Sequence, residues 1–124
     1  MNAFDRAKTA YSSPDAPTRT MRGSEYDAFA RLTHRLKAAD TQAKRDYAAL
    51  VKALHDNRAL WSVLAADVAD PDNGLPLHLR QQIYSLARFT DKHTSRVLAG
   101  AASAETLIAI NTAIMRGLRK GAAP

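Results

Sequence analysis

Residues that could take part in acid–base or metal chemistry are few and widely spaced. The chain has no cysteine, so thiolate catalysis and thiolate metal sites are excluded. No two of its four histidines are four residues apart, which is the spacing of a two-histidine metal site on a helix. These histidines are His34, His55, His78 and His93. The sequence therefore predicts no metal site.

The remaining polar groups do not form a catalytic pattern either. His93 lies within an apolar stripe of helical spacing, where a histidine is more often a hydrogen-bonded core residue than a base or a ligand. Asp67 and Asp70 are close in sequence, but they border a predicted loop, where carboxylates face water or cap a turn. Glycine-rich phosphate loops and the G-x-S-x-G turn of serine hydrolases are absent. We expect a protein that is not an enzyme and that binds no cofactor.

The most informative run is Asn57-Arg58-Ala59-Leu60-Trp61, which contains the single tryptophan. It interrupts a long apolar stripe with helical spacing, so Asn57 falls where an apolar side chain is expected. A buried asparagine must find hydrogen-bond partners within the core, and it therefore fixes packing geometry. For Trp61, core packing is favoured over contact with a partner. The stripe consists of Tyr47, Leu50, Val51, Leu54, Leu64 and Val68.

The elements that position these residues are predicted to be helices, because no segment alternates with period two. The second and third helices are expected to follow one another with little break, and Asp70-Pro71-Asp72-Asn73-Gly74 is the clearest loop. Pro76 suits the first turn of the fourth helix. Phe89 is expected to widen the apolar stripe of that helix. Ser103 is expected to cap the fifth helix, which Gly117 and Gly121 can end. The predicted helices are 3–11, 24–40, 41–68, one from 76 to about 100, and one from about 105.

These elements predict an all-α fold, a single-domain helical bundle of about five helices. One domain is expected over residues 1–124, with an N-terminal helix and loop at 1–19, a main helical body at 20–120 and a frayed tail at 121–124. The N-terminal helix is either a packing arm on the main body or a flap over a partner site.

Charge and hydropathy narrow the class of partner. The formal charge is +6, but basic and acidic residues alternate along most of the chain. The densest basic patch is Arg116, Arg119 and Lys120 near the end. Aromatic residues make up 6% of the chain and give no stacking platform for bases, so direct binding of nucleic acid is not expected. No signal peptide or membrane span is evident, which predicts a cytoplasmic protein.

Three blocks in this order resemble the FlaF family of flagellar proteins of alphaproteobacteria. They are NRALWSVL at 57–64, LPLHLRQQI at 75–83 and LIAINTAIMRGL at 107–118. The opening Ala10-Tyr11 and Ser13-Pro14 fit as well, so the resemblance spans nearly the whole chain. The positions that match the family pattern are Asn57, Arg58, Trp61, Leu75, Pro76, Arg80, Ile83, Asn111, Gly117 and Leu118. For most of them a structural role is favoured over contact with a partner.

The resemblance implies a small cytoplasmic helical protein required for the production and export of flagellin. It would act on flagellin as a secretion chaperone and oppose FlbT, a partner that regulates flagellin synthesis. A helical chaperone could shield an amphipathic flagellin segment in an apolar groove. The expected groove residues are Phe4, Tyr11, Tyr26 and Phe29, although their spacing also suits ordinary core packing.

Two alternatives stay open at the level of sequence. One is a post-transcriptional regulator that acts through flagellin mRNA or through FlbT, and binding to RNA would weaken steeply as salt rises. The other is a structural component that joins two flagellar proteins in a stoichiometric assembly.

Overall fold

The computed structural model describes residues 24–122 of the chain, and this part contains four helices joined by short connections, with no strand. The all-α prediction is confirmed for a domain of four packed helices. The predicted helix at 3–11 lies outside the described residues. The described helices are α3 (Ser24–Thr41), α4 (Tyr47–Ala69), α5 (Leu77–Leu98) and α6 (Glu105–Ala122).

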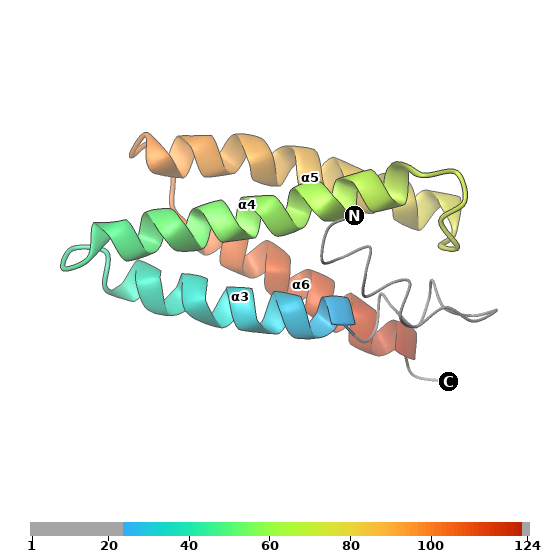
Figure 1. Cartoon of the computed structure of the whole chain (residues 1–124), viewed down its shortest axis with the longest axis horizontal. Helices are drawn as coiled ribbons and strands as arrows, with labels where there is room; N and C mark the ends of the chain where they lie inside the picture. Colours follow the sequence, from blue (N-terminus) through green and yellow to red (C-terminus); the bar gives the residue numbers. More distant parts are fainter. Residues whose placement is uncertain (1–23, 123–124) are drawn as a thin grey trace.

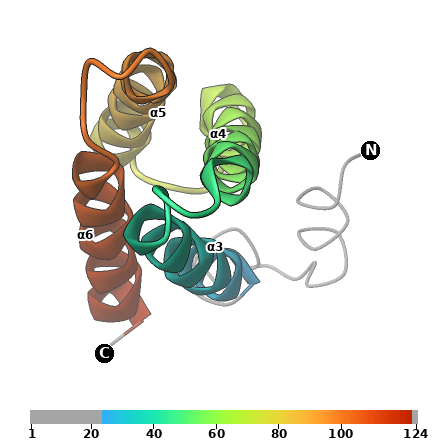
Figure 2. The same ribbon diagram turned by 90° about the vertical axis from the view of Figure 1, so that its left-hand side faces the viewer.

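The helices pack as a bundle in which α3, α4 and α5 are successively antiparallel and α6 crosses them. Helix α4 lies between α3 and α5 and runs antiparallel to both (Figure 1). Helix α6 crosses behind them and packs mainly against α3, with a smaller contact to α5 (Figure 2). The boundary between α4 and α5 therefore has one side that faces the core and one that faces outward.

The first connection corrects the prediction that helix 41–68 begins at Thr41. A turn occupies 42–46, and α4 begins at Tyr47. The Asp46 side chain accepts a hydrogen bond from the Ala49 amide at 3.0 Å, and it thereby caps the free N–H groups of the first turn. The helical spacing of apolar residues continues through this break and therefore does not reveal it. The sequence signal for the new helix start is the single capping residue Asp46.

The second connection is held together by side chains, as the predicted loop requires. Asn73 donates from Nδ2 to the Asp67 backbone carbonyl and carboxylate, both at 3.2 Å, and accepts from the Leu75 amide at 3.0 Å. Arg80 donates from α5 to the carbonyls of Leu75 (3.2 Å) and Asp70 (3.3 Å). Buried Leu75 closes the loop over the core. Pro76 stands immediately before α5, not within its first turn.

The third connection follows α5 through Gly100. This glycine has φ of +76°, a left-handed conformation that other residues adopt only at a cost. Ser103 then accepts, through Oγ, a hydrogen bond from the amide of Glu105, the residue at which α6 begins, at 3.0 Å. Its backbone carbonyl accepts from His93 Nε2 at 2.9 Å, so His93 is a hydrogen-bonded buried residue as predicted.

The core consists of two apolar clusters at opposite ends of the bundle. The first lies toward the α4–α5 loop and the second toward the α3–α4 turn. Between them they bury residues from all four helices. The first cluster is Phe29, Trp61, Leu64, Val68, Leu75, Ile83 and Ala87. The second cluster is Leu36, Ala39, Leu50, Ala53, Leu54, Val97, Ala104 and Leu107.

Other sequence expectations are wrong at particular residues. Tyr47 and Val51 belong to the apolar stripe of α4 but are exposed, because that helix has a second apolar face directed outward. Phe89 is 46% exposed and stacks on His93, so it does not widen the buried apolar stripe of α5. Gly117 does not end α6, which continues to Ala122.

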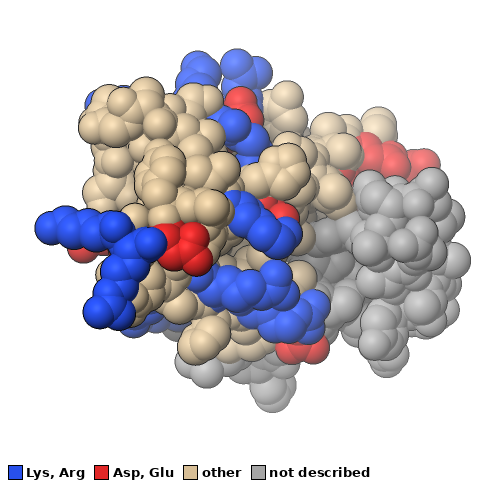
Figure 3. Space-filling view, turned by 60° about the vertical axis from the view of Figure 1, so that its left-hand side comes forward, with Lys and Arg blue, Asp and Glu red and all other residues tan. Residues whose placement is uncertain are grey.

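The described surface is of mixed charge. On the face in Figure 3, basic side chains appear at several separate places with acidic side chains beside most of them. This agrees with the alternation of charge in the sequence and does not resemble one continuous phosphate-binding face.

Candidate partner-binding seam

A layer of buried polar side chains separates the two apolar clusters. On α4, for example, Asn57 lies between Leu54 of the second cluster and Trp61 of the first. Each of the other helices places a polar residue at the equivalent point. We call this set the polar layer; its members are Thr33 on α3, Asn57 on α4, Thr90 and Thr94 on α5, and Asn111 on α6.

Asn111 is the centre of the hydrogen bonds in the polar layer. Its Oδ1 accepts from Trp61 Nε1 at 2.9 Å, and its Nδ2 donates to Asn57 Oδ1 at 2.7 Å. All three side chains are at most 1% exposed. Asn57 Nδ2 has no hydrogen-bond partner, and neither do Thr33 Oγ1 and Thr90 Oγ1. The layer therefore specifies how α4 and α6 meet, at the cost of unsatisfied buried groups.

Arg58, the neighbour of Asn57, faces the outer side of α4. Its Nη2 donates to the Asp91 backbone carbonyl and to Ser95 Oγ, both at 2.6 Å. Its Nε lies 3.0 Å from Asp91 Oδ1. A single arginine thus fastens the middle of α4 to α5.

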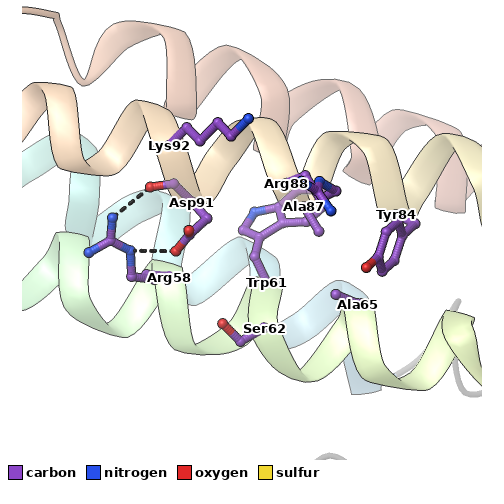
Figure 4. A pocket seen from close by; sticks show the side chains of 9 residues that line it. All are labelled: Arg58, Trp61, Ser62, Ala65, Tyr84, Ala87, Arg88, Asp91 and Lys92. Carbon is purple, nitrogen blue, oxygen red and sulfur yellow. Dashed lines mark hydrogen bonds and ion pairs between the residues drawn. The ribbon is translucent and has the colours of Figure 1, made fainter.

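A cavity of about 260 Å³ opens beside this arginine, between α4 and α5 (Figure 4). Trp61 lies at its base, with its ring edge held from behind by Asn111. Tyr84, Arg88 and Lys92 line the α5 side. A second hollow continues past Tyr84 toward Val68 and Leu77, so the depression extends to the end of the helix pair.

The outer boundary between α4 and α5 is a regular strip, which we call the seam. Its α5 residues are seven apart, and its α4 residues follow the same face, as in helices that pack through heptad positions. Several are exposed large apolar side chains, with Leu77 at 60% and Tyr84 at 40%. The seam consists of Tyr47, Val51, Arg58, Ala65 and Ala69 on α4 and of Leu77, Tyr84, Asp91 and Leu98 on α5.

Two basic side chains beside the seam are not neutralised. Arg88 and Lys92 line the cavity one helical turn apart, and within the described part of the chain neither has an acidic partner. The groove between α3 and α4 differs, because Asp56 there lies 3.2 Å from Lys52 and 3.9 Å from Arg35. Of the Lys and Arg side chains that line these two grooves, Arg88 and Lys92 are therefore the ones without an acidic partner among the described residues.

Among residues 24–122, no group of histidine and acidic side chains could hold a metal ion. No helix in this range combines the length and hydropathy needed to cross a bilayer.

Comparison with known protein families decides where the chain belongs. The family model of flagellar protein FlaF matches residues 7–118, which is most of the chain. The chain belongs to the FlaF family. Comparisons with curated proteins and with solved structures found no match.

The structure gives most positions of the FlaF family pattern a place in the packing. Asn57, Trp61 and Asn111 form the hydrogen-bonded trio, and Arg58 fastens α4 to α5. Leu75, Pro76 and Arg80 shape the α4–α5 loop, and Ile83 is buried in the first cluster. Gly117 lies exposed within α6, and the Leu118 side chain is outside the described part.

Of the four residues predicted to form the partner groove, the structure describes two, Tyr26 and Phe29. Phe4 and Tyr11 lie outside the described residues, and Tyr26 is half-buried. Phe29 is fully buried and packs edge-to-face on Trp61, with 5.3 Å between ring centroids. Their contact with a partner stays a prediction.

Sequence reasoning did not identify the seam itself. The signal was present in the seven-residue spacing of Leu77, Tyr84, Asp91 and Leu98. This spacing was obscured because the adjacent positions of α5 form a stronger apolar stripe, which faces the core.

Proposed function

We propose that this FlaF family member is a cytoplasmic flagellin-binding chaperone that promotes the synthesis and export of flagellin. Its action is to cover an amphipathic segment of flagellin and keep that segment from associating with other copies. Binding stabilises the covered state by mass action, and release follows when export removes flagellin.

The observation that supports this proposal most directly is the exposed apolar surface along the seam. Leu77, Tyr84, Leu98, Tyr47 and Val51 are all more than a third exposed, although they follow the spacing of residues that normally pack against another helix. Family membership supports a flagellar role. A surface of this kind suits a helix-in-groove complex.

Isothermal titration calorimetry of the protein with monomeric flagellin tests the proposal. Full-length flagellin and flagellin without its terminal segments are compared, each at low and at moderate salt. We expect saturable one-to-one binding that requires a terminal segment and persists at moderate salt. The absence of binding to either form of flagellin at both salt concentrations would overturn the chaperone function.

A second candidate function is post-transcriptional regulation of flagellin expression, through flagellin mRNA or through FlbT. The observations that favour it are the formal charge of +6 and the two unpaired basic residues beside the seam. Affinity for flagellin mRNA should then fall steeply with salt, because each neutralised phosphate releases counterions. Titration with purified FlbT separates an action through that regulator from an action on RNA.

A further inference from the structure

We propose that the seam is the docking site for one amphipathic helix that has carboxylate side chains at its centre and apolar residues toward both ends. The inference rests on the proposed function only in taking this helix from flagellin. Its chemistry follows from the arrangement of apolar and basic groups along α4 and α5.

The length of the seam sets the size of the partner. From Leu77 to Leu98, α5 extends about 32 Å at roughly 1.5 Å per residue. A bound helix of about 20 residues would therefore cover the seam from end to end. Helices α4 and α5 run antiparallel and are extensively in contact, so their boundary presents residues of both helices to a partner.

The two ends of the seam are apolar. Toward the α4–α5 loop, the exposed side chains of Leu77 and Tyr84 flank the hollow that reaches Val68. Toward the other end, Tyr47 and Leu98 are held together, because the Tyr47 hydroxyl donates to the Leu98 carbonyl at 3.4 Å. A helix with apolar residues on one face can bury both patches at once.

The middle of the seam is polar and positively charged. Asp91 is already paired with Arg58, so the charges left for a partner are those of Arg88 and Lys92. These two side chains stand one turn apart on α5, and a partner helix could meet them with two acidic residues spaced by one turn. Opposite charges at such a position fix the register of the complex and speed its formation.

The same charges disfavour a second copy of this chain as the occupant. A symmetric dimer would place the same patch on both sides of the interface, so the basic pairs of both copies would be brought into one contact. Like charges brought together in this way cost affinity. The charge complement of the seam is therefore an acidic helix.

Charge reversal tests the inference in the full-length protein. Binding of full-length flagellin is measured by calorimetry for the double variant Arg88→Glu with Lys92→Glu. The matched control is Arg31→Glu with Lys37→Glu, which makes the same change at exposed positions of α3. We expect the seam variant to weaken binding by about tenfold or more, and the control by less than about threefold.

A second pair of variants tests the apolar end and keeps the inference testable if charge reversal disturbs folding. Tyr84→Ala removes an exposed aromatic residue from the seam, whereas Phe89→Ala removes one of similar exposure from another side of α5. Only the first should weaken binding. Circular dichroism verifies that each variant is folded.

The outcomes separate this inference from the proposed function. If the unchanged protein binds flagellin and neither seam variant weakens binding beyond its control, the seam is not the site, although the chaperone function stands. If the unchanged protein does not bind flagellin, both proposals fail. A concentration-dependent dimer by light scattering that Tyr84→Ala abolishes would identify a second copy as the occupant and overturn the inference.

Discussion

Replacing Asn111 by leucine should destabilise the fold much more than the same change at Asn57, although both side chains are fully buried. Leucine has as many side-chain heavy atoms as asparagine, so each change exchanges polar for apolar atoms with little loss of contact. The difference arises from the hydrogen bonds. Asn111 serves two partners, whereas Asn57 serves one and already has an unsatisfied amide group.

The magnitude follows from the buried groups that each change leaves without a partner. Asn111→Leu strands Trp61 Nε1–H and Asn57 Oδ1, and at about 1–3 kcal/mol for each the free energy of unfolding should fall by about 2–6 kcal/mol. Asn57→Leu strands Asn111 Nδ2 but removes the unsatisfied Asn57 Nδ2, so its cost should stay near the ~1 kcal/mol typical of a point substitution.

The double variant makes the reasoning decisive, because it strands only Trp61 Nε1–H. It should therefore be more stable than Asn111→Leu alone, which is the opposite of additive behaviour. Urea unfolding followed by far-ultraviolet circular dichroism and by the emission of Trp61 gives the free energies, provided that the m-values agree. If Asn57→Leu costs as much as Asn111→Leu, or if the double variant loses the sum of both, the hydrogen-bond argument is refuted.

The same urea measurements check three further predictions, which concern the Arg58–Asp91 pair, the two helix-end and mid-helix glycines, and the cap of α4. Arg58→Ala should cost about 1–3 kcal/mol because it loses hydrogen bonds to the Asp91 carbonyl and to a serine hydroxyl; Asp91→Asn should cost less than about 1 kcal/mol, since that carboxylate is largely exposed. Gly100→Ala should destabilise by about 1–2 kcal/mol at its positive φ. Gly117→Ala should stabilise by about 0.5–1 kcal/mol, because its φ is not positive and its Cβ would meet no neighbour; equal effects at the two glycines would contradict this account. Asp46→Ala should cost about 1 kcal/mol through loss of the α4 cap, and no change would show that the cap is dispensable.

Local pattern was enough to predict the helical class and the burial of Asn57. An asparagine on an apolar face has few ways to be accommodated, so its burial could be inferred from spacing alone. Its partner could not be inferred. Asn111 lies 54 residues away on a helix that crosses the others, and helical periodicity contains no information about which helices meet.

The errors at Tyr47, Val51 and Gly117 have two physical causes. Periodicity identifies an apolar face but does not say whether it meets the core or solvent, and α4 has apolar residues on both. Glycine costs little within a helix when packing elsewhere compensates, and here α6 is held by its buried face, so Gly117 did not end it. The seam was missed for the first of these reasons.

The polar layer and the seam are connected through Trp61. Its ring forms the base of the cavity between α4 and α5, while its Nε1–H is held by Asn111 on α6. Arg58, three residues before it, fixes the distance between α4 and α5 from the outside. A change in the position of α6 would therefore move the base of the cavity without touching any exposed residue. If the seam binds a partner as proposed, Asn111 on α6 would help to shape that surface through Trp61, although it lies on neither of the two helices that form the seam.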